Sequence, residues 1–164
     1  MYIKKIREAR GDSNLILLHH QGLGDAIVCN GMVNILSTKF DKIFLAINER
    51  YVEQINFLYS KNSKIEIFSI SCDTDKDLLN FSESNNVKIL KVGFENRKKG
   101  PFNTQLYKQL RINYKISFQN FYLPEDREKS HLLESHLFKY YKIVDKFILV
   151  HSEADKINYP IELN

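Results

Sequence analysis

The chain has 164 residues, of which 43% are hydrophobic and 27% charged, and 24 basic against 20 acidic residues give a formal net charge of +4. These values are typical of one globular domain with a single core, and they exclude wholesale disorder. No run approaches the roughly 18 to 20 apolar residues that cross a bilayer, and the N-terminus lacks the apolar core of a signal peptide. We therefore expect a cytoplasmic protein without a transmembrane segment.

Charge and cysteine patterns argue against two further classes. Basic residues are scattered apart from Arg97-Lys98-Lys99, whereas nucleic-acid binders concentrate them on one stripe, so we expect no nucleic-acid partner. Cys29 and Cys72 have neither the number for a disulfide framework nor the histidine partners of a zinc site. We expect no metal site, and we interpret Cys29 as a buried structural cysteine.

Short apolar runs alternate with helical patterns along the first 92 residues. Leu15–Leu18 is a continuous apolar run of the kind found in a parallel strand covered on both faces. Further strands are expected at Lys42–Ile47, Ile65–Ile70 and Val87–Val92, and helices at Asp25–Lys39, at Glu49–Tyr59 and after Asp73. This order predicts an α/β fold, a three-layer Rossmann-like doubly wound domain with a mainly parallel sheet.

The pattern changes after Phe102. Helices are expected at Asn103–Leu110 and Pro124–Tyr141, followed by a last strand at Lys146–His151. One side of the second helix gathers apolar and aromatic residues: Leu132, Leu133, His136, Leu137, Tyr140 and Tyr141. We interpret the aromatic stretch from Tyr107 to Tyr122 as core packing, or alternatively as a surface that another domain covers. The expected domain is 1–151, with 152–164 a tail or the start of a missing second domain.

The turn between the first strand and the first helix carries the chemistry. Gly22 and Gly24 let the backbone adopt unusual dihedral angles and let a ligand approach closely. N–H groups at a helix start favour an anion, and in a doubly wound sheet this turn lies at the ligand-binding edge. A simpler interpretation is a tight turn with Asp25 as a plain helix N-cap.

The two common nucleotide motifs do not match this turn. A P-loop needs the pattern Gly-x-x-x-x-Gly-Lys-Ser/Thr, and this pattern does not occur in the chain. A dinucleotide fingerprint needs a third glycine, where this chain has Ile27, and Asp25 would place a negative charge beside a pyrophosphate.

The segment from His20 to Gly31 resembles the start of the N-terminal domain of GT-B glycosyltransferases, especially the heptosyltransferase-like group of glycosyltransferase family 9. There the first strand also ends in a Gly-x-Gly-Asp or Met-Gly-Asp turn, as Gly22-Leu23-Gly24-Asp25 does here. Tyr107–Leu110, Phe118–Pro124 and Phe147–Ser152 resemble later parts of such enzymes. The resemblance implies one half of a GT-B fold.

It also implies a role for each residue of the turn. Asp25 would be the general base that takes the proton of an acceptor hydroxyl. The substrate-binding residues would be His20, Gln21, Gly22, Leu23 and Gly24. The substrates would be a saccharide acceptor and a nucleotide-sugar donor, with no separate cofactor.

GT-B enzymes have two Rossmann-like domains, and this chain has about half the expected length. The donor side would come from a second domain, a partner chain or a homo-oligomer, which leaves open whether this chain alone is an enzyme. The alternative is a non-catalytic Rossmann-like module that binds a nucleotide or a partner.

Overall fold

The computed structural model describes residues 1–71, 74–93, 101–142, 144, 153–154 and 157–158. Its internal contacts divide the chain into two units, Met1–Pro124 and Glu125–Asn164, and each is described by itself. The strand expected at Lys146–His151, the domain boundary expected at 151 and the cluster Arg97-Lys98-Lys99 lie outside the described residues.

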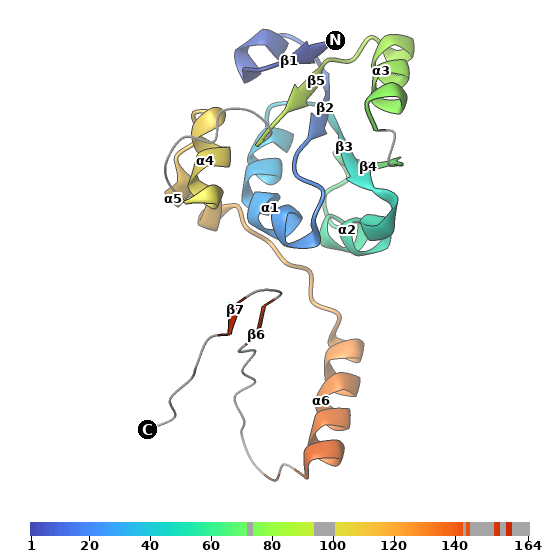
Figure 1. Ribbon diagram of the computed structural model, residues 1–164, viewed down its shortest axis with the longest axis vertical. Helices are drawn as coiled ribbons and strands as arrows, with labels where there is room; N and C mark the ends of the chain where they lie inside the picture. Colours follow the sequence, from blue (N-terminus) through green and yellow to red (C-terminus); the bar gives the residue numbers. More distant parts are fainter. Residues whose placement is uncertain (72–73, 94–100, 143, 145–152, 155–156, 159–164) are drawn as a thin grey trace. The chain divides into compact units, whose positions relative to one another are not determined.

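The first unit is built on a five-stranded sheet in which every neighbouring pair is parallel (Figure 1). Its strands are β1 (Tyr2–Ile3), β2 (Asn14–Leu18), β3 (Lys42–Asn48), β4 (Ile65–Ile70) and β5 (Ile89–Lys91). The α/β prediction with a mainly parallel sheet is thus confirmed. Strand β1 was not predicted, because two residues carry no periodicity.

The strand order β1-β5-β2-β3-β4 determines where a ligand can bind. The chain runs from β2 outward through β3 to β4, and then returns to pair β5 with the other side of β2. The strand order therefore reverses between β2 and β5, and the carboxyl ends of these two strands border a topological switch point.

Helices cover both faces of the sheet, as a doubly wound fold requires. One core contains Leu15 and Leu17 of β2 together with residues of α1 (Leu23–Ser37), α2 (Val52–Leu58) and α4 (Phe102–Gln109). The other core contains Ile16 and Leu18 of β2 together with Leu78 of α3 (Thr74–Asn85). The alternation along β2 distributes its apolar side chains between two layers of helices.

Several helix boundaries differ from the prediction by one to three residues, and two of these differences have a local reason. The first turn expected in the second helix is a 3₁₀ turn, Glu49–Tyr51, because the side chain of Asn48 accepts a hydrogen bond from the backbone N–H of Arg50 at 3.0 Å. Helix α6 (Arg127–Tyr141) begins three residues later than expected, because Asp126 caps it by accepting from the N–H of Lys129.

Helix α5 (Tyr114–Gln119) was not predicted, since six residues are too few for a clear helical period. It packs on α1 at Gly31, where an added Cβ would lie 3.0 Å from the backbone carbonyl carbon and Cα of Ser117. The second unit contains α6 and a short antiparallel pair, β6 (Glu153–Ala154) with β7 (Ile157–Asn158). Within the described residues, no helix has the length and apolar character needed to cross a bilayer.

Candidate functional site

The turn predicted as the site leads from β2 into α1 at the switch point. Helix α1 begins at Leu23 with Gly22 as its N-cap, so Asp25 lies in the first turn and the interpretation of Asp25 as the N-cap is wrong. Gly22 has no side chain that could cap the first N–H groups. Its φ is −79°, and Gly24 is not among the residues with positive φ, so the turn does not use the glycines' conformational freedom.

The glycines instead provide space. A Cβ added to Gly22 would lie 2.9 Å from Oδ2 of Asp25, so the carboxylate of Asp25 lies over Gly22. Among the described residues, no atom lies within 4 Å of a Cβ added to Gly24, so they leave this side of the turn open. Asp25 is half-buried and Leu23 and Gly24 are exposed. A ligand could therefore approach the backbone at Gly24 with the carboxylate beside it.

His20 connects the two strands that border the switch point. Its Nε2 donates to the backbone oxygen of Gly93, just after β5, at 2.6 Å. Gly93 has a φ of +89°, and a Cβ there would lie 2.7 Å from Cδ2 of His20 and 2.5 Å from the side chain of Leu106. Position 93 must therefore be a glycine for the His20 imidazole to lie in this place.

Gln21 spans the ends of β2 and β3. Its Nε2 donates to the backbone oxygens of His19 at 2.6 Å and Ala46 at 3.2 Å. Its Oε1 is buried and has no hydrogen-bond partner among the described residues. The amide nitrogen thus serves the fold, while the amide oxygen is an unused acceptor.

His19 is the residue of this site that sequence reasoning did not select. It is fully buried, and its Nδ1 donates to the backbone oxygen of His20 at 2.5 Å. Burial lowers the pKa of His19, an effect that the charge of Asp25 opposes. The ring is therefore neutral near pH 7, and Nε2 is a lone-pair acceptor that, within the described residues, has no partner. The strand alternation Leu15, Leu17, His19 could have indicated this burial.

Helix α4 supports both sides of the switch point. The side-chain amide of Gln109 donates to the backbone oxygen of Lys91 at 2.8 Å and accepts from the N–H of Gly93 at 2.9 Å. The hydroxyl of Tyr107 donates to Val28 O at 2.9 Å and accepts from Met32 N–H at 3.1 Å. Sequence reasoning selected neither role, since both partners are distant along the chain.

Two further predictions concern reactive groups near the turn. Cys29 is fully buried, and burial raises the pKa of its thiol to about 12, so the prediction of a structural cysteine is confirmed. In the part of the chain that the structure describes, no three His, Cys, Asp or Glu residues are arranged to hold a metal ion.

No protein-family model, curated protein or solved structure matches the chain. The fold and this turn define the first unit as a Rossmann-like α/β domain with a candidate site at its switch point.

Proposed function

We propose that this domain binds a saccharide acceptor at the switch point and forms the acceptor side of a glycosyl-transfer site, with a nucleotide-sugar as donor. The observation that carries the proposal is the set of hydrogen-bond acceptors around one turn. These are the carboxylate of Asp25 and two buried atoms that have no hydrogen-bond partner among the described residues, Nε2 of His19 and Oε1 of Gln21.

Such a set suits hydroxyl groups better than an anion. Buried acceptors without a donor cost free energy, and a ligand hydroxyl that reaches them recovers it. A phosphate would bring further acceptors beside a carboxylate, which Coulomb repulsion disfavours. A sugar presents several hydroxyl donors at once.

The carboxylate of Asp25 would act on the reacting hydroxyl. As that oxygen forms the new bond to the anomeric carbon, the bond from that carbon to the donor's phosphate oxygen breaks. The proton of the hydroxyl passes to Oδ of Asp25, and the nucleoside diphosphate leaves with the electron pair. The donor's binding groups would come from a second domain, a partner chain or another copy.

The first test is thermal unfolding of the chain in the presence of separate ligand classes. Saccharides, sugar phosphates, nucleotide-sugars, free nucleotides, NAD and NADP would each be tested. A ligand at 100 times its Kd stabilises the folded state by about 2.7 kcal/mol. We expect a saccharide to raise Tm, and Gly24→Val to remove that shift without changing the Tm of the free protein, because position 24 is open.

The second test separates binding from transfer. Asp25→Asn keeps the shape of the side chain but removes the base, so we expect saccharide binding to persist while nucleoside diphosphate release in the completed enzyme falls about 10²- to 10⁴-fold. Unchanged release of nucleoside diphosphate by Asp25→Asn would show that Asp25 is not the general base. A Tm shift with nucleotides or NAD and none with saccharides would favour the non-catalytic binding module instead.

A further inference from the structure

A second surface feature lies on α5 and the segment after it. Five large apolar side chains within eight residues are exposed; Phe118 is 68% and Leu123 51% exposed, and the other three are 41–43% exposed. We call this set the α5 patch: Ile116, Phe118, Phe121, Tyr122 and Leu123. The interpretation of this aromatic stretch as core packing holds for Tyr107 and is wrong for Phe118. Exposed large apolar side chains gathered in one short segment indicate a candidate interaction surface.

The α5 patch is held by α1. Ser117, on the inner side of α5, is buried against Gly31. Beyond α5, the side chain of Asn34 donates to the backbone oxygen of Asn120 at 3.0 Å, and the backbone N–H of Tyr122 donates to Oδ1 of Asn30 at 2.9 Å. The backbone that carries these side chains is therefore anchored to α1 within the first unit.

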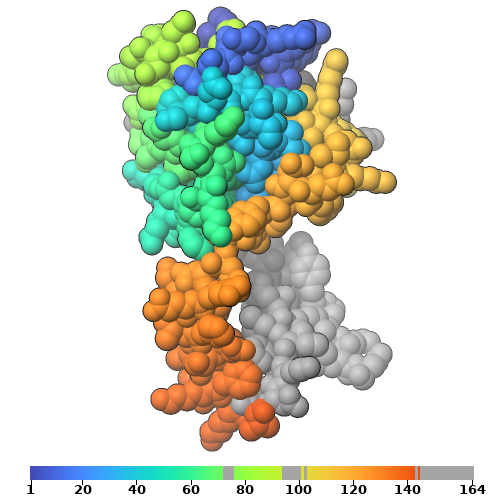
Figure 2. Space-filling view, turned by 180° about the vertical axis from the view of Figure 1, so that it is seen from behind, coloured from blue at the N-terminus to red at the C-terminus, as the bar shows by residue number. Residues whose placement is uncertain are grey.

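The surroundings of the α5 patch are basic. Residues 101–123 contain Lys108, Arg111 and Lys115, all exposed, and neither Asp nor Glu. Figure 2 shows this segment, in yellow to orange, as a continuous block on one side of the first unit. Nζ of Lys61 lies 5.6 Å from the ring centre of Tyr122 and adds a fourth positive charge.

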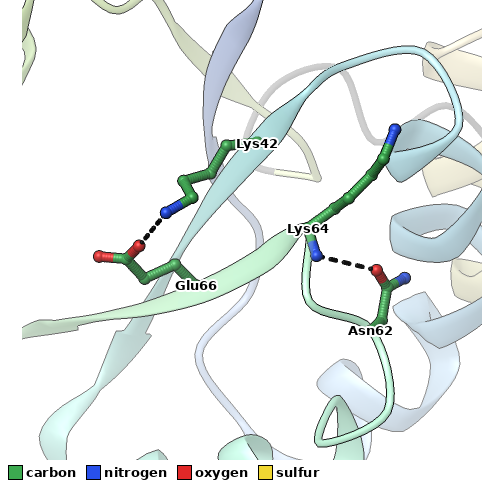
Figure 3. A network of polar contacts seen from close by, with 4 residues as sticks. All are labelled: Lys42, Asn62, Lys64 and Glu66. Carbon is green, nitrogen blue, oxygen red and sulfur yellow. Dashed lines mark hydrogen bonds and ion pairs between the residues drawn. The ribbon is translucent and has the colours of Figure 1, made fainter.

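The carboxylates nearest in sequence to these cations are already paired. Glu66 lies 2.7 Å from Nζ of Lys42 (Figure 3). Following the α5 patch, Glu125 pairs with Arg127 at 3.1 Å, and Asp126 pairs with Lys129 at 3.4 Å. The positive charge around the α5 patch is therefore not cancelled by these acidic groups.

We propose that the α5 patch docks on an anionic lipid surface. Aromatic and aliphatic side chains would enter the boundary between headgroups and acyl chains, and the surrounding Lys and Arg would contact lipid phosphates. The charge decides between lipid and a second copy of this patch, because two basic patches facing each other repel. The proposal does not depend on the chemistry at Asp25.

Vesicle co-sedimentation of the full chain tests the proposal. We expect the chain to bind phosphatidylcholine vesicles that contain 30% phosphatidylglycerol, to bind pure phosphatidylcholine weakly, and to lose binding as salt rises. Each cationic side chain contributes about fivefold to the affinity. Lys115→Glu should therefore weaken binding about 25-fold, and Phe118→Ser should weaken it about tenfold or more.

Two variants serve as matched controls. Lys76→Glu reverses an exposed charge on α3, and Leu132→Ser removes an exposed apolar side chain on α6; neither should change vesicle binding or Tm. The Tm of Phe118→Ser and of Lys115→Glu is measured to establish that both variants are folded. The proposal fails if anionic vesicles do not bind the chain, or if Leu132→Ser abolishes binding that Phe118→Ser retains. It also fails if Phe118→Ser only converts a dimer to a monomer in sedimentation velocity.

Discussion

Helices α1 and α6 both have 15 residues, and they are stabilised in different ways. Eight residues of α1 are buried, yet no side chain among the described residues caps its N-terminus. No residue of α6 is buried, yet Asp126 caps its N-terminus and Lys142 ends it in the left-handed conformation. Tertiary packing thus holds α1, while local signals define α6.

This difference explains why the candidate site lies at α1. A helix held by its buried side can leave its first turn uncapped and open to a ligand, because its stability does not depend on a cap. A helix with no buried residue depends on its cap and on charge pairs within its first turns. Four substitutions test the comparison, from the largest expected effect to the smallest.

Gly31→Val should have the largest effect, because its side chain would overlap the backbone of Ser117, which cannot move aside without displacing α5. We expect a loss of about 2–3 kcal/mol in the free energy of unfolding, measured by urea titration. Gly24→Val on the same helix is the matched control and should change stability by no more than about 0.5 kcal/mol. Equal losses at both positions would show that the α1–α5 contact is not what holds α1.

Tyr107→Phe removes a hydroxyl that lies between Val28 O and Met32 N–H, a pair that ordinarily bonds directly within a helix. We expect a loss of about 1 kcal/mol, with faster amide hydrogen exchange at Met32. Tyr114→Phe is the control, since its half-buried hydroxyl accepts a hydrogen bond from the side chain of Asn103 on α4, at 2.7 Å. Unchanged exchange at Met32 would contradict the role of Tyr107 in supporting α1.

The buried His19 should make stability depend on pH. Its pKa is lowered in the folded state, so below pH 6.5 the unfolded state binds more protons and stability falls until the lowered pKa is passed. Above pH 6.5 this contribution is constant. Urea titrations between pH 5 and 8 should show that the free energy of unfolding falls as the pH falls below 6.5 in the wild type and in the control His136→Gln, whose site is exposed. In His19→Gln this dependence on pH should be absent. A slope that persists in His19→Gln would assign it to another group.

Leu133→Ser on α6 should have the smallest effect. Leu133 is 59% exposed, so we expect Leu133→Ser to change the free energy of unfolding of the first unit by less than about 0.5 kcal/mol. Near-ultraviolet circular dichroism and Tm would measure it, with Leu36→Ser on α1, a fully buried position, as the destabilised comparison. A loss comparable to that of Leu36→Ser would mean that α6 stabilises the first unit.

The prediction from sequence succeeded where one segment carries its own signal. The apolar run Leu15–Leu18 and the alternation in Ile65–Ile70 gave two strands, and the glycines gave the turn at the site. It failed for β1 and α5, which are too short for a period, and for Phe118, whose hydrophobicity says nothing of whether a partner covers it. The roles proposed for Asp25, His20 and Gln21 remain predictions.

The sequence by itself determined the α/β class and the place of the Gly22–Asp25 turn between a strand and a helix, because periodicity and glycine content are local properties. Only the tertiary structure decided the strand order, and with it the switch point between β2 and β5. It also decided that His19 is buried with no partner for Nε2 in the part of the chain that the structure describes, and that Gly93 makes room for His20. These contacts join residues far apart in the chain, and no local pattern encodes which distant surface a side chain will meet.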